Sequence, residues 1–192
     1  MHVNNLFTIK TIIAYKRTGR ASEASLVEGC LMNNRKAQKM LYERYCDAMY
    51  TIAYRITNDI SLAGDVLQEV FIQVFSDLAQ FRGEASLGSW IKTITVRTAV
   101  RKIRTESTFS GNGLGDSDEP VIWPEAMTGS DLEKAILSLP EGARTVFLLV
   151  EVEGYKHREV AEMLSISEGT SKSQLNFAKR KLQTLLKDFT ER

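Results

Sequence analysis

All three prolines of this chain lie in one region, at positions 120, 124 and 140, and none precedes residue 120. Proline interrupts helices because it lacks a backbone N–H and clashes with the preceding turn, so the proline-free stretch can form helix after helix. Clear strand alternation occurs nowhere, and the sequence predicts an all-α fold. The strongest helical stripe has apolar residues at spacings of three and four: Leu62, Val66, Val70, Val74, Leu78 and Phe81.

The same periodicity predicts three helical runs in the first half of the chain, Ser25 to Ile56, Ser61 to Phe81 and Leu87 to Arg104. Ser61 is the predicted N-cap of the second run. Four shorter helices are predicted from Asp131 onward. The first stops near Pro140, Gly154 ends the second, "KHREVAEML" forms the third, and the fourth begins near Glu168.

Residues 105–130 break the helical pattern, because they are rich in Gly, Ser, Asp and Pro and strongly acidic. We therefore expect two helical domains joined by a flexible acidic linker, the C-terminal one a four-helix helix-turn-helix domain. The expected boundaries are an N-terminal extension at 1–21, a core domain at 22–105, the linker at 106–130 and the second domain at 131–192.

The composition argues against several classes of function. The net charge is only +1, so nucleic-acid binding requires local basic patches. Cys30 and Cys46 form no CxxC pair and the two histidines lack metal-ligand spacing, so we expect reduced cysteines and no metal or other cofactor. The first 20 residues resemble neither a signal peptide nor a membrane helix, which favours a cytoplasmic protein without membrane attachment.

One such basic patch lies near the C-terminal end. Residues 170–187 contain five Lys or Arg and no Asp or Glu. They follow a short amphipathic helix with the small residue Ala161, a pattern typical of a helix-turn-helix. Either Ser165 or Ser167 can cap the second helix, and Ser165 with Glu168 fits a capping box. In a helix-turn-helix, the N-terminal half of the second helix enters the major groove of DNA.

Four stretches of the chain resemble the extracytoplasmic-function (ECF) sigma factors. "HREVAEMLSISEGTSKSQLNFAKRKL" is similar to the DNA-reading domain of that family, and "SLPEGARTVFLLVEVEGYKHREVAEML" to the segment leading into it. "AGDVLQEVFIQVFSDLAQFRGEASLGSWIKTI" and the preceding "AQKMLYERYCDAMYTIAYRITND" resemble the N-terminal core domain. "GTSKSQL" and "GEASLGSWI" are most like Bacteroidetes-type members. The resemblance implies a non-catalytic subunit that recruits bacterial RNA polymerase to promoters.

The resemblance also implies three sets of site residues, because each motif position has a role in the family. For the promoter −35 element they are Thr170, Ser171, Lys172, Ser173, Gln174, Phe177, Lys179, Arg180 and Lys181. For the melted −10 element they are Arg82, Gly83, Glu84, Ala85, Ser86, Lys92, Arg97, Arg101, Lys102 and Arg104. For the clamp helices of the polymerase they are Asp65, Gln68, Glu69 and Gln73.

The chain departs from the family pattern at several of these positions. Arg97 stands where relatives usually carry Asn, and Arg101 where they often carry Asp. Since Arg cannot accept a hydrogen bond, the favoured −10 base is expected to differ. Phe177 replaces a usual Arg, and Ser165 replaces a usual turn Gly, at little cost if its φ stays negative. Trp90 fits core packing better than a role as a stacking wedge.

The implied partners are core RNA polymerase, through its clamp helices and flap, and promoter DNA in double-stranded and melted form. An anti-sigma factor is a further partner that the resemblance allows, and the free protein is expected to be a monomer. Two other function classes fit the sequence less well. A free-standing helix-turn-helix regulator would need a dimerisation element, and no heptad seam is present. An enzyme would need a nucleophile–base pair, metal cluster or phosphate loop, none of which the sequence contains.

Overall fold

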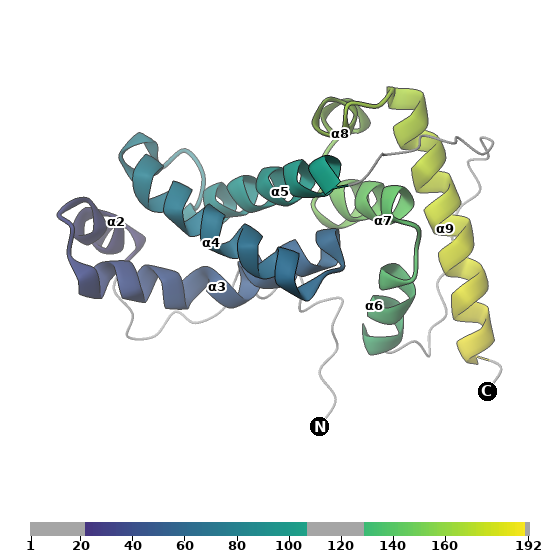
Figure 1. Ribbon diagram of the computed structural model, residues 1–192, viewed down its shortest axis with the longest axis horizontal. Coiled ribbons are helices and arrows are strands. Elements are labelled where there is room, and N and C mark those ends of the chain that lie inside the picture. Colours follow the sequence, from purple (N-terminus) through teal and green to yellow (C-terminus); the bar gives the residue numbers. More distant parts are fainter. Residues whose placement is uncertain (1–21, 107–128, 191–192) are drawn as a thin grey trace. The chain divides into compact units, whose positions relative to one another are not determined.

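The computed structural model describes residues 22–106 and 129–190, which belong to two compact helical units (Figure 1). No strand occurs within these residues, which confirms the all-α prediction. The expected N-terminal extension and residues 107–128 of the expected linker lie outside the described part of the chain.

The first unit contains a three-helix core with a fourth helix against it. Its elements are α2 (Glu23–Leu31), α3 (Arg35–Thr57), α4 (Ile60–Asp77), the 3₁₀ turn η2 (Leu78–Gln80) and α5 (Leu87–Glu106). Helices α3, α4 and α5 pack on one another, and α2 packs on α3 (Figure 1). Leu41, Val70 and Ile91, one from each core helix, are completely buried. Burying one such side chain stabilises the fold by about 1.5–3 kcal/mol.

The expected continuous helix from Ser25 to Ile56 is wrong, because the chain turns between α2 and α3. Asn33 adopts φ 58°, in the left-handed region that Asn tolerates better than most residues. The side chain of Asn34 then caps α3 by accepting hydrogen bonds from the backbone N–H groups of Lys36 (2.9 Å) and Ala37 (3.3 Å). The pair of asparagines was the sequence signal for this break.

The expected cap of α4 is also wrong. The carboxylate of Asp59, not the hydroxyl of Ser61, accepts the hydrogen bond from the N–H of Leu62, at 2.7 Å. The helix begins at Ile60 and gives way to η2 at Leu78, so the predicted Ser61–Phe81 helix is displaced at both ends. Its buried stripe is nevertheless correct, since Val66, Val70 and Val74 are all fully buried.

Two glycines in these helices provide a matched test of the packing. A Cβ on Gly29 would lie 2.7 Å from the Cβ of Ala37, whereas a Cβ on Gly64 would meet no atom within 4 Å. We expect Gly64→Ala to raise the free energy of unfolding by about 1 kcal/mol through helix propensity. Gly29→Ala should lower it by roughly 1 kcal/mol, because overpacking of about 1–3 kcal/mol exceeds that gain. Urea denaturation of both variants measures the difference, and equal shifts would contradict the close contact between α2 and α3.

The second unit consists of α6 (Gly129–Leu137), α7 (Glu141–Phe147), α8 (His157–Leu164) and α9 (Glu168–Thr190), in agreement with the four predicted helices. Helix α7 continues as a π-helical turn, η3 (Leu148–Val152), and the helical stretch ends before Gly154 at φ 80°. Helices α6, α7 and α8 all pack on α9. The core contains the fully buried Leu149, Leu164 and Leu182.

Candidate nucleic-acid interface

Helices α8 and α9 are joined by a tight turn that begins at Ser165. This residue adopts φ 53° and ψ 44°, and the N–H of Ile166 donates to the carbonyl oxygen of Ala161 at 3.1 Å. The negative φ that would make Ser165 a low-cost replacement for the usual Gly is therefore not adopted. A non-glycine residue in this region costs about 1–2 kcal/mol, which the packing of the two helices offsets.

Ser167, rather than Ser165, caps α9. Its hydroxyl oxygen accepts a hydrogen bond from the N–H of Thr170 at 2.9 Å and lies 2.8 Å from the hydroxyl of the same residue. The capping-box alternative that used Ser165 is wrong, because Ser165 closes the preceding helix instead. The side chain of Thr170 is thus involved in the cap at the start of α9.

One side of α9 is buried against the rest of the unit. Ser171, Leu175, Ala178 and Leu182 form this stripe, with exposures of 0–6%. Since Ser171 is completely buried, it cannot contact DNA in this conformation, and we withdraw it from the expected contact set. At 3.6 residues per turn, the opposite side carries Ser173, Asn176, Phe177 and Arg180.

The orientation of α9 divides the other predicted −35 residues into half-buried and exposed ones. Gln174 and Lys179 flank the buried stripe on its two sides and are half-buried, while Lys172 and Lys181 are exposed. Sequence reasoning missed Asn176, although the period of the buried residues would have placed it beside Phe177 on the outer side. Asparagine can pair with adenine through two hydrogen bonds.

Two of the predicted −35 cations form ion pairs in the free protein. Lys179 Nζ lies 2.9 Å from a carboxylate oxygen of Glu151, which the π-helical turn η3 presents to α9. Lys172 Nζ lies 3.3 Å from Glu168, one turn earlier in α9. The Lys172 pair is solvent-exposed, and such pairs contribute about 0–1 kcal/mol. Lys172 can therefore exchange its carboxylate for a DNA phosphate at small cost.

A contact that the sequence did not predict joins the two helices of the motif. His157, the first residue of α8, lies with Nδ1 2.9 Å from the hydroxyl oxygen of Ser171 in α9. Burial lowers the pKa of His157, and the positive charges of Lys172 and Lys179 lower it further, against the opposing effect of Glu168 and Glu151. The neutral imidazole is thus the form favoured by the folded state.

This shift predicts a pH dependence of stability. The pKa of His157 is lower in the folded state than its unfolded value of about 6.5. The unfolded state therefore takes up a proton that the folded state resists, so stability is retained above pH ~6.5 and falls as the pH drops through this value. Urea denaturation between pH 5 and 8 should show this loss for the wild type and a smaller loss for His157→Gln. His2→Gln should keep the wild-type slope, and a slope that His157→Gln leaves unchanged would refute the assignment.

The predicted −10 loop lies between η2 and α5. All five of its predicted residues, from Arg82 to Ser86, are exposed, and Gly83 adopts φ 72°. The hydroxyl of Ser86 accepts a hydrogen bond from the N–H of Ser89 at 3.2 Å, which caps α5. The loop is therefore held at both ends by helices and leaves its side chains open to solvent.

The predicted cations of α5 are not equivalent. The guanidinium of Arg101 and the ammonium of Lys102 both contact the carboxylate of Glu69 in α4, the latter at 3.3 Å. Arg97 is exposed and forms no ion pair with any described residue. Lys92 is half-buried and Arg104 is exposed on the same helix. Arg97 is consequently the most available of the predicted cations on α5 in the free protein.

Trp90 packs against Phe81 rather than projecting from the surface. The two ring centroids lie 5.5 Å apart with an interplanar angle of 49°, and both rings are half-buried. Tilted aromatic pairs of this kind stabilise a fold by about 0.5–1.5 kcal/mol beyond the burial of their area. This contact supports core packing over a stacking wedge.

The four predicted polymerase contacts lie on α4. Asp65, Gln68 and Gln73 are exposed, with the amide nitrogen of Gln73 3.3 Å from a carboxylate oxygen of Asp77, whereas Glu69 is half-buried by its contacts with α5. Ile72, which was not among the residues expected on this surface, has an exposed fraction of 64%. At 3.6 residues per turn, Ile72 continues the stripe of Asp65 and Gln68. The exposed side of α4 thus combines polar side chains with one exposed isoleucine.

The described residues contain no group of three or more His, Cys, Asp or Glu side chains placed to hold a metal ion. No helix within them is both long and apolar enough to cross a membrane.

Comparison with known families gives two matches in chain order. The model of Sigma-70 region 2 matches residues 41–108, and that of Sigma-70, region 4 matches residues 130–182. The ECF RNA polymerase sigma-E factor of Haemophilus influenzae is 28% identical over 183 residues, which cover 84% of this chain and 94% of that protein. The chain belongs to the ECF-type RNA polymerase sigma factors.

Other relatives agree with this family. The ECF sigma factor SigM of Mycobacterium tuberculosis is 26% identical over 86% of this chain and 85% of its own length. Among solved structures, the sigma factor RpoE of Bartonella quintana, in complex with the anti-sigma factor NepR, is 21% identical over 78% of this chain and 96% of that chain, with a TM-score of 0.49. Because regions 2 and 4 of the family match in order, the sigma factor described here is a transcription initiation factor that directs RNA polymerase to promoters.

Proposed function

We propose that the second unit reads the −35 element with the outer side of α9. Ser173, Asn176 and Phe177 face the major groove, and Phe177 contacts a thymine methyl group in place of the arginine usual at this position. Lys172, Arg180 and Lys181 bind phosphates on either side and supply affinity without sequence information. The exposed positions of these cations and the burial of the opposite stripe support this orientation.

The first unit, in this proposal, reads and opens the −10 element. Separating base pairs costs stacking energy of about 1.4 kcal/mol per step, so the displaced strand must be held by other contacts. The exposed loop from Arg82 to Ser86 receives an extruded base, and Arg97 binds the displaced strand. Arg101, Lys102, Lys92 and Arg104 extend this cationic surface along α5.

The exposed side of α4 binds the clamp helices of the polymerase through Asp65, Gln68, Gln73 and the added residue Ile72. Glu69 belongs to both proposed surfaces, because it contacts Arg101 and Lys102 in the free protein. These pairs are partly exposed and contribute about 1 kcal/mol or less. Binding of Glu69 by the polymerase would therefore release two cations to the DNA at low cost.

Several finer properties extend the proposal. The domains are an N-terminal extension at 1–21, a core domain at 22–105, a linker at 106–130 and a second domain at 131–192. The chain is of the Bacteroidetes type. It acts in the cytoplasm and is a monomer until it binds the polymerase. The second unit also contacts the polymerase flap, and an anti-sigma factor holds the protein inactive. Co-purification of the tagged chain from its own cells tests for the anti-sigma factor.

The observation that carries this function is the occurrence of two helical units in one chain, matched in order by regions 2 and 4 of the family. Run-off transcription with purified core RNA polymerase and a candidate promoter should yield a discrete transcript only when the protein is added. The protein alone should bind the same DNA weakly. Tight binding without polymerase, together with no transcript, would instead favour a free-standing regulator.

A further inference from the structure

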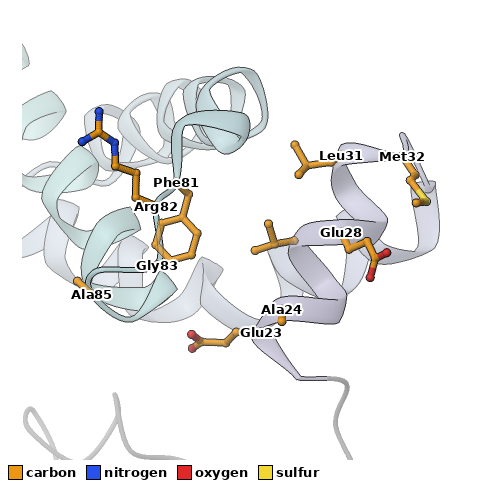
Figure 2. A pocket seen from close by; sticks show the side chains of 10 residues that line it. Glu23, Ala24, Glu28, Leu31, Met32, Phe81, Arg82, Gly83 and Ala85 are labelled. Atoms are coloured by element: carbon orange, nitrogen blue, oxygen red, sulfur yellow. The ribbon is translucent and has the colours of Figure 1, made fainter.

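A pocket of about 620 Å³ lies within the first unit, between α2 and the loop that follows η2. Figure 2 shows Phe81 of the loop facing α2 across the pocket, with Leu31 and Met32 at the far end of that helix. Ala24, Val27 and Ala85 also belong to its apolar lining. None of the polymerase contacts proposed above lines this pocket.

The pocket leaves apolar side chains in solvent. Leu31 is 50% and Met32 is 73% exposed, and they are two of the five large hydrophobic residues that are exposed in the described part of the chain. Covering apolar surface is favourable by about 25 cal/mol per Å². The pocket therefore favours an occupant with an apolar face.

Two glutamates, against the single cation Arg82 in the lining, give the pocket a net acidic rim. Glu23 is fixed there, since its carboxylate accepts hydrogen bonds from the hydroxyl of Tyr45 (3.0 Å) and from the N–H of Leu87 (3.2 Å). Burial and the neighbouring Glu23 raise the pKa of Tyr45 to about 12, so the hydroxyl remains a donor. Glu28 is exposed and forms no ion pair with a described residue. An occupant that is both apolar and basic would match this rim.

We propose that the occupant is the chain's own N-terminal segment, residues 1–21. This segment has an apolar stretch from Leu6 to Tyr15, and its first 20 residues contain four Lys or Arg and no Asp or Glu. It also enters α2 directly at Ser22, the N-cap of that helix. Composition, charge and chain connectivity therefore all match the pocket.

The length of the segment is sufficient. The seven residues from Tyr15 to Ser22 can span about 23 Å when extended, whereas α2 is about 14 Å long. The apolar stretch can thus reach Leu31 and Met32 at the end of the helix. Because the segment is tethered, its effective concentration is in the millimolar range, and modest apolar contact is enough to hold it.

Docking would also affect the −10 loop, and this consequence rests on the proposed function of that loop. The segment would cover the side of the loop that faces α2 and would place basic charge beside Glu23 and Glu28. The negative field next to the loop would fall, which favours the approach of the displaced DNA strand.

Limited trypsin digestion of the full-length protein tests the docking without polymerase or DNA. Cleavage after Lys10, which lies within the apolar stretch, should be slow in the wild type when followed by mass spectrometry, because proteolysis follows the population of the undocked form. The double variant Leu31→Gln, Met32→Gln, which removes apolar surface without adding charge, should be cleaved about tenfold faster, corresponding to 1.4 kcal/mol of lost docking. Ile60→Gln is the matched control, since Ile60 is 72% exposed but lies outside the pocket.

A second measurement does not depend on these substitutions. Carbodiimide treatment of the wild type should join the Glu28 carboxylate to Lys10 or Lys16, and Leu31→Gln, Met32→Gln should abolish this cross-link. Equal cleavage rates in all three proteins, with no cross-link, would overturn the proposal. If the double variant instead lost affinity only for a single-stranded −10 oligonucleotide, the pocket would be a DNA site and the proposal would also be wrong.

Discussion

Replacing Ile72 with aspartate is expected to weaken binding to core RNA polymerase by about 30-fold or more. Ile72 is 64% exposed, and the polar residues Asp65 and Gln68 lie on the same side of α4. An apolar side chain at the centre of an interface typically contributes about 2 kcal/mol or more, which corresponds to that factor. An aspartate would add the cost of a carboxylate that loses its water without gaining a partner. Surface plasmon resonance with immobilised core enzyme measures the change.

Ile60→Asp is the control for this prediction. Ile60 is also exposed, at 72%, and lies in the first turn of the same helix. At 3.6 residues per turn the two isoleucines point about 120° apart. Ile60→Asp should therefore leave the affinity within about twofold, whereas equal losses in the two variants would place the polymerase surface elsewhere. Circular dichroism and urea denaturation should show both variants to be folded, because neither side chain is buried.

The helices were predictable from sequence because their apolar residues follow a regular period. The buried stripe of α4 and the position of α5 agree with the pattern of apolar residues. The errors lie at helix ends, where a single side chain decides between neighbouring residues. Asp59 and Ser61 can both cap a helix, and only the fold around Thr57 to Leu62 selects Asp59. Helix boundaries depend on such local hydrogen bonds more than on periodicity.

Contacts between separate helices were less predictable than the helices themselves. Nothing in the spacing of His157 and Ser171, or of Glu69 and Arg101, indicates that these side chains meet. The position of Ser171 in the N-terminal half of the second helix placed it among the expected DNA contacts, and its complete burial removes it. The outer position of Asn176, in contrast, follows from the period of the buried residues and was available to sequence reasoning.

Replacing Asn176 with alanine is expected to remove base discrimination at one position of the −35 element. Asn176 lies on the side of α9 opposite the buried Leu175 and Ala178, where a helix in the major groove meets base edges. A bidentate contact to a base contributes about 1–3 kcal/mol of discrimination, or roughly 5- to 150-fold. Binding of the polymerase complex to a library of −35 variants measures this preference position by position.

The comparison with Gln174→Ala makes this prediction specific. Gln174 has a longer side chain of the same chemistry and is half-buried like Asn176, but it lies beside the buried stripe rather than opposite it. We expect Gln174→Ala to change base preference less than threefold at every position, below the range of a bidentate contact. If Gln174→Ala erased the preference at one position and Asn176→Ala did not, the groove-facing side of α9 would be rotated toward Thr170 and Gln174. The phosphate contacts of Lys172 and Arg180 would then need to be reassigned, because a helix that turns in the groove moves every contact along its length.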